Sequence, residues 1–83
     1  MELEKEFESA AAKAKELPRP SNDDLLTMYA LYKQATEGDI NMDKPSNPFD
    51  LVGNAKYHAW NKLKGTTKEE AMKGYIKFVS GLS

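Results

Sequence analysis

GDINMDKPSNPFD, residues 38–50, is the stretch that decides how the helices of this chain are arranged. It contains two prolines, two asparagines and a glycine, and its apolar residues follow no helical period, so it predicts a long ordered loop. At about 3.3 Å per residue this loop can reach roughly 40 Å, whereas a helix of about 16 residues is only about 24 Å long. The helices on either side of it can therefore run parallel, which a short connection does not allow.

Two amphipathic helices are predicted before this loop. The first is expected over residues 2–17, where apolar residues, many of them alanine, recur at helical spacing until Pro18. The second is expected over residues 22–37, with Ser21 as its N-cap and Gly38 just past its end. The short connection between them makes these two helices antiparallel.

Two further helices are predicted after the loop. The third spans about residues 51–64 and stops at Gly65. The fourth begins after Thr67, whose spacing to Glu70 is that of a capping box, and continues to near the end of the chain. The sequence thus predicts an all-α fold, a four-helix bundle of up-down-down-up order with a long connection between helices two and three. The 83 residues are enough for one domain, 1–83, with a single small core.

The composition limits the classes of function. Net charge is -1, from 12 Lys+Arg and 13 Asp+Glu, so no overall field draws the chain to nucleic acid or to an anionic membrane. Zero cysteines exclude a disulfide framework, no apolar run approaches the roughly 20 residues of a membrane span, and the start MELEKEF lacks the regions of a signal peptide. We therefore expect a cytoplasmic protein without stable membrane insertion. We also expect a monomer, because four packed helices leave no spare apolar stripe.

Patterns for catalysis and for metal binding are missing from the sequence. The single histidine, His58, has no second histidine or carboxylate at ligand spacing, and there is no cysteine and no serine in an elbow-type turn. GTTK, at residues 65–68, lacks the preceding glycine and the residue order of a P-loop. We expect no enzyme activity, no metal and no cofactor.

Tyrosines and lysines form the most unusual pattern in the chain. Tyr29, Tyr32 and Lys33 are three or four residues apart and so share one face of the second helix. Lys56 and Trp60 repeat the four-residue spacing on the third. An unpaired ammonium is costly to bury, but at the edge of a groove it can hold a phosphate beside rings that stack on a base. In the alternative interpretation the rings belong to the core and the lysines extend to water, and spacing alone favours this alternative.

Two long segments carry a resemblance to a known family. YKQATEGDIN at 32–41 and AKYHAWNKLKGTTKEEAMKGYI at 55–76 closely resemble the acyl-CoA-binding protein family, and the likeness covers nearly the whole chain. The resemblance implies the same up-down-down-up bundle and non-catalytic binding of medium- and long-chain acyl-CoA esters. It further implies an intracellular acyl-CoA pool former and carrier, with acyl-CoA-using enzymes as partners. The chain departs from the family pattern at Tyr57, where tryptophan is usual, and at His58, where an acidic residue is typical.

The resemblance also implies a ligand site. The family's acyl-CoA-binding tyrosines and lysines match Tyr29, Tyr32, Lys33, Lys56 and Tyr75, and a further basic position matches Lys15. Lys33 and Lys56 would hold the ribose 3′-phosphate, Tyr32 would lie at the adenine, and Lys15 would approach another phosphate of CoA. The acyl chain would lie in a groove bordered by Ala10 and Ala11 of the first helix and Leu26 of the second.

Two other functions stay open on the sequence. A small helical protein-interaction domain with no lipid ligand would use the aromatic stripe entirely as core and would bind no acyl-CoA. A thioesterase or another small enzyme would need a nucleophile or an activated water, for which the sequence offers no arrangement.

Overall fold

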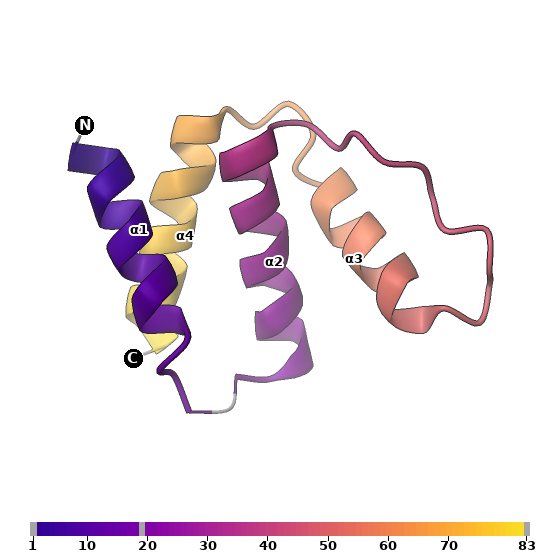
Figure 1. Cartoon of the computed structure of the whole chain (residues 1–83), viewed down its shortest axis with the longest axis horizontal. Helices are drawn as coiled ribbons and strands as arrows, with labels where there is room; N and C mark the ends of the chain where they lie inside the picture. The colour runs from indigo at the N-terminus through magenta and orange to yellow at the C-terminus, as the bar shows by residue number, and fades with distance from the viewer. Residues whose placement is uncertain (1, 19, 83) are drawn as a thin grey trace.

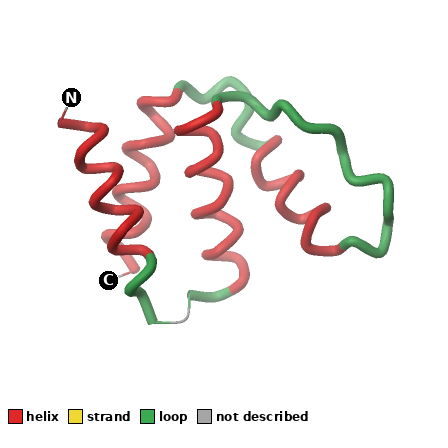
Figure 2. Tube along the Cα trace, viewed as in Figure 1, coloured by secondary structure: helices red, strands yellow, loops and turns green. Residues whose placement is uncertain are grey.

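The computed structural model describes residues 2–18 and 20–82, and this part of the chain forms four α-helices. They are α1 (Glu2–Ala14), α2 (Asn22–Glu37), α3 (Leu51–Asn61) and α4 (Lys68–Leu82). Figure 1 shows that α2 and α3 run in one direction and that α1 and α4 run in the opposite one. The segment 38–50 passes outside α3 without helix or strand, as Figure 2 shows. The predicted all-α bundle of up-down-down-up order is confirmed.

Side-chain caps fix three of the helix starts. The Asp24 N–H donates to Ser21 Oγ over 3.1 Å at the start of α2, and the Glu70 N–H donates to Thr67 Oγ1 over 3.1 Å at the start of α4. Asp50 caps α3, because its Oδ1 accepts the Gly53 N–H at 3.0 Å. These bonds satisfy amides that have no partner within the helix, so the capping sequences predict the starts well.

Two helices end earlier than predicted. α1 stops at Ala14 rather than at residue 17, and α3 stops at Asn61 rather than at residue 64. In both places the next turn tightens: the Leu17 N–H bonds to the Ala14 carbonyl at 3.3 Å and the Leu63 N–H to the Trp60 carbonyl at 2.9 Å. Bonds of this i→i−3 kind commonly finish a helix. The apolar period continues into these tighter turns, which is why periodicity alone placed the ends too late.

The helices form a flat arrangement centred on α4 and α2. Among the described residues α4 packs against α1 and α2, α3 packs against α2 alone, and the backbones of α1 and α2 do not come close to each other. The molecule measures 39 × 28 × 15 Å. Ala35 and Ala71 are almost fully buried in the core cluster, and their small side chains let α2 and α4 approach closely. The separation of α1 from α2 leaves a groove between them.

A buried glutamine ties the end of α2 to the connection before α4. Gln34 is 0% exposed, and its Nε2 donates to Asp39 Oδ1 at 2.9 Å and to the Thr66 carbonyl at 2.7 Å. Asp39 Oδ1 also accepts the Gly65 N–H at 2.9 Å. The hydrogen bond from Gly65, and to a smaller extent the one from Gln34, lowers the pKa of the Asp39 carboxyl. This cluster holds the C-terminal end of α2 against the connection between α3 and α4.

Candidate ligand-binding site

A groove lies between α1 and α2, with α4 beneath it. This hollow, the α1–α2 groove, has a volume of about 500 Å³. Its α1 side is made mainly of small residues, Ala11, Ala12 and Ala14, followed by Lys15 in the turn after the helix. Glu8 also lines it from α1. The remaining lining residues belong to α2 (Leu25, Met28, Tyr29 and Tyr32) and to α4 (Tyr75). The alanines matter because larger side chains would fill the space that the separated helices leave open.

Three aromatic rings pack at this groove. Tyr32 stacks on Phe7 with ring centres 5.5 Å apart, and Tyr75 meets Phe7 edge to face at 5.1 Å. Tyr75 is 5% exposed and belongs to the core, whereas Tyr32 remains 43% exposed. Burial raises the pKa of the Tyr75 hydroxyl. Tyr75 is thus a core ring that also reaches the lining of the groove, while Tyr32 exposes part of its ring and packs against Phe7.

A second groove adjoins the first across α2. The α2–α3 groove has a volume of about 350 Å³ and is lined by Asn22, Leu25, Leu26, Tyr29, Leu51, Val52, Ala55 and Lys56. Leu25 and Tyr29 line both grooves. Tyr29 thus stands where the two hollows meet, with apolar surface on each side of it.

Each of the two predicted phosphate lysines lies against an aromatic ring on the neighbouring helix. The Lys56 ammonium of α3 lies 5.2 Å from the centre of the Tyr29 ring of α2. The Lys33 ammonium of α2 lies 5.7 Å from the Trp60 ring of α3. The four-residue spacing puts Lys56 and Trp60 on one face of α3, and each of them contacts a side chain of α2. Both contacts are of the cation–π kind.

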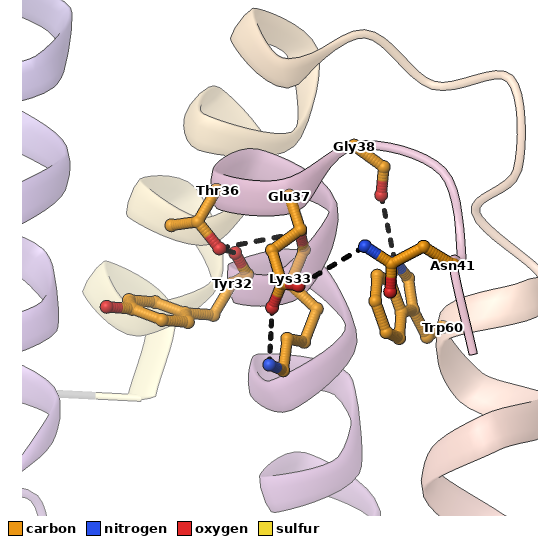
Figure 3. Close-up of polar contacts among 7 residues, drawn as sticks. All are labelled: Tyr32, Lys33, Thr36, Glu37, Gly38, Asn41 and Trp60. Carbon is orange, nitrogen blue, oxygen red and sulfur yellow. Dashed lines mark hydrogen bonds and ion pairs between the residues drawn. The ribbon is translucent and has the colours of Figure 1, made fainter.

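Lys33 also forms an ion pair with Glu37, one turn further along α2 (Figure 3). Glu37 in turn accepts a hydrogen bond from Asn41 Nδ2 at 3.4 Å. The Trp60 indole is fixed, since it is 1% exposed and donates from Nε1 to the Gly38 carbonyl at 3.0 Å. The spacing of Lys33 and Glu37 could have signalled the pair from the sequence, because residues four apart share a helix face.

The structure brings together most of the predicted site residues. Lys15, Ala11, Tyr29, Tyr32 and Tyr75 line the α1–α2 groove, and Leu26, Tyr29 and Lys56 line the α2–α3 groove. Lys33 lies one helical turn beyond Tyr29 and lines neither groove. Ala10 lies elsewhere: it is 8% exposed within the core and reaches a different groove, between α1 and α4. The sequence reasoning did not identify Phe7, Leu25 and Glu37 as parts of the site.

A larger hollow, of about 540 Å³, lies between α2 and α3 and includes His58 and Lys62. Of the predicted site residues it contains only Leu26. Within the described ranges no cluster of His, Asp or Glu is placed to hold a metal ion. A search of the same ranges finds no helix with the length and hydropathy to cross a membrane.

The fold and the site together define a small all-helical binding module, with aromatic rings and lysines placed beside apolar grooves. The acyl-CoA-binding protein family model matches residues 4–79, and the chain belongs to that family. It is 49% identical over 78 residues to an acyl-CoA-binding protein of Dictyostelium discoideum, covering 93% of this chain and 92% of that one. It is 51% identical over 77 residues to acyl-CoA-binding protein homolog 1 of Caenorhabditis elegans, covering 92% and 88% of the two chains. The crystal structure of Oryza sativa acyl-CoA-binding protein 2 superposes with a TM-score of 0.91 at 47% identity, over 96% of this chain and 89% of that one.

Proposed function

We propose that this protein binds medium- and long-chain acyl-CoA esters and serves as an intracellular pool and carrier for them, without catalysing a reaction. Binding of this ligand class follows from membership of the family. The observation that carries the site assignment is the position of Tyr29, which joins two apolar grooves and lies under the ammonium of Lys56. A helical interaction domain without a lipid ligand is not favoured, because the matched relatives and the solved rice structure are acyl-CoA-binding proteins by name.

The polar end of the ligand suits the lysines and the exposed tyrosine. The 3′-phosphate of CoA would lie near Tyr29 between Lys56 and Lys33, and the adenine would use the exposed face of Tyr32. Lysine binds phosphate through charge-assisted hydrogen bonds, and aromatic rings stack on bases. Lys15, at the far side of the α1–α2 groove, is within the same surface and can meet a second phosphate.

The tail of the ligand suits the apolar grooves. Alanines of α1 border one groove, and Leu25, Leu26 and Ala55 border the other. A buried methylene contributes about 0.8 kcal/mol, so a dozen of them offer up to roughly 10 kcal/mol before the costs of ordering. An exposed lysine and a phosphate contribute about 1 kcal/mol. The tail therefore supplies most of the affinity, and the nucleotide supplies the specificity.

The remaining parts of the proposal concern the setting of the protein. We place it in the cytoplasm as a monomer that hands acyl-CoA to enzymes that use it. Because the ester bond has to survive transport, the site has to hold the ligand without offering a nucleophile or a general base to the thioester. No cofactor takes part in this role.

Extraction of ligand from a lipid surface tests the proposal. Phosphatidylcholine vesicles loaded with radiolabelled palmitoyl-CoA are mixed with the protein and sedimented, and we expect the label to move into the supernatant in proportion to protein. A thiol reagent then reports any free CoA, and with zero cysteines the protein gives no background signal. Lys33→Met/Lys56→Met is the control variant and should extract less. Label that stays with the vesicles would refute carrying, and steady release of thiol would refute the absence of catalysis.

A further inference from the structure

The charge of the Lys33 ammonium is already balanced by a carboxylate of the same helix. Its Nζ bonds to Glu37 Oε2, and the two side chains are only 32% and 39% exposed. Figure 3 shows the carboxylate lying between Lys33 and Asn41, whose Nδ2 donates to its other oxygen at 3.4 Å. Glu37 is thus held from the loop side while it binds the lysine. A phosphate that binds Lys33 therefore has a carboxylate beside it.

Lys33 also lies beside a buried aromatic ring. The Trp60 ring lies 5.7 Å from the ammonium, and this ring is buried and anchored to the Gly38 carbonyl. The hydrogen bond with Glu37 raises the pKa of Lys33. The hydrogen bond from Lys33, and to a smaller extent the one from Asn41, lowers the pKa of Glu37. Both partners are therefore charged at neutral pH, and the pair is an ionic one.

We propose that Glu37 is an internal competitor for the ligand phosphate, and that it sets how much the 3′-phosphate contributes to binding. This inference rests on the proposed function, in which Lys33 holds that phosphate. The incoming phosphate either displaces the carboxylate from Lys33 or stays beside it as a like-charged neighbour, and both routes reduce affinity. Glu37 thereby weakens the nucleotide end, leaves the tail as the main determinant and speeds ligand release.

The expected size of the effect follows from exposed charges in water. Breaking a partly exposed ion pair changes an equilibrium constant by up to about fivefold. A carboxylate about 4 Å from a phosphate in water has a repulsive effect of the same order. Because the two costs are alternatives and do not add, removing the charge should tighten binding by about three- to fivefold at low salt. The gain should shrink near 1 M salt, where the Debye length is only about 3 Å.

The variant Glu37→Gln tests this with little change of shape. The amide oxygen of glutamine can still accept a hydrogen bond from Asn41 or Lys33, so the end of α2 and the loop keep their contact. Glu6→Gln is the matched control: it removes the same charge from an exposed residue in the groove between α1 and α4. Thermal unfolding of both variants checks that each is folded.

Calorimetry with two ligands gives the decisive comparison. We expect Glu37→Gln to bind palmitoyl-CoA about three- to fivefold more tightly than the wild type. It should bind palmitoyl-dephospho-CoA, which lacks the 3′-phosphate, within about twofold of the wild type. Glu6→Gln should change the affinity for neither ligand. In a Lys33→Met background the gain should be smaller, because there is no ion pair left to break and only the repulsion between the carboxylate and the phosphate remains. Equal or weaker binding of palmitoyl-CoA by Glu37→Gln would overturn the inference, and so would an equal gain for both ligands. If the wild type binds palmitoyl-CoA and the variant shows no gain, this inference alone fails; if the wild type does not bind it, the proposed function fails as well.

Discussion

Replacing Lys56 with methionine separates ligand binding from folding. Lys56 is exposed on α3, and its ammonium lies 5.2 Å from the centre of the Tyr29 ring. Methionine keeps a long unbranched side chain and can still cover the ring, but it has no charge for a phosphate. The substitution therefore removes the cation from the junction of the two grooves and leaves their apolar lining in place.

The two effects differ in size. An exposed cation–π contact contributes about 0.5 kcal/mol to stability, which corresponds to a fall in Tm of about 2–4 °C for a domain of this length. A lysine that bonds a phosphate at an exposed site contributes about 1 kcal/mol to binding. Lys56→Met should therefore weaken palmitoyl-CoA binding by about fivefold.

Lys62→Met provides the control for this experiment. Lys62 is also exposed and follows the same helix, but it lines the hollow that contains His58 and not the α2–α3 groove. Calorimetric titrations with palmitoyl-CoA and palmitoyl-dephospho-CoA should show a loss for Lys56→Met mainly with the first ligand, and none for Lys62→Met with either. Unchanged affinity of Lys56→Met, or equal losses in the two variants, would refute the assignment of Lys56 to the phosphate.

Three further predictions concern stability and the tail. Gln34→Ala should lower the free energy of unfolding by about 2–3 kcal/mol in urea denaturation, because it removes a fully buried side chain and its bonds to Asp39 and Thr66; a loss under about 1 kcal/mol would contradict the role of this clamp. The lowered pKa of Asp39 means that its contribution to stability is present above its ordinary value of 3.8 and is lost as pH falls through the lower folded value. Asp39→Asn should thus have a lower free energy of unfolding than the wild type at pH 7 and should lose less of it as the pH falls. Asp43→Asn should behave as the wild type. Parallel curves of unfolding free energy against pH for the wild type and both variants would contradict this role of Asp39. Shortening the acyl chain of the ligand by two methylenes should weaken binding by up to about fifteenfold until the grooves are no longer filled, and affinity that ignores chain length would show that the tail is not bound there.

Much of the fold could be predicted from local features of the sequence. The caps Ser21 and Thr67 and the positive-φ Gly38 act through bonds to nearby residues, so their effect is visible in a short window. The length of the 38–50 loop limits the topology by simple reach, and the parallel arrangement of α2 and α3 follows. The predicted ends of α1 and α3 were wrong because an apolar period does not distinguish an α-helical turn from a tighter one.

The site could be predicted less completely, because it depends on how the helices are spaced. Ala10 and Ala11 are neighbours in sequence, yet only Ala11 faces the α1–α2 groove while Ala10 is core. That division follows from the separation of α1 and α2, which no short motif determines. The residue-by-residue likeness to the family selected Tyr29, Lys33 and Lys56, whereas spacing alone favoured a simple core. The pairing of Lys33 with Glu37 was accessible from spacing, but the approach of Lys33 to Trp60 required the third dimension.

The most direct measurement for the central claim is a calorimetric titration with palmitoyl-CoA, free CoA and palmitate side by side. The arrangement of lysines and tyrosines beside apolar grooves predicts tight binding of the intact ester and feeble binding of either half, because each half uses only one part of the site. Fluorescence of the single tryptophan, Trp60, gives an independent probe beside Lys33. Absence of binding by heat and by fluorescence, or palmitate bound as tightly as its CoA ester, would contradict the account.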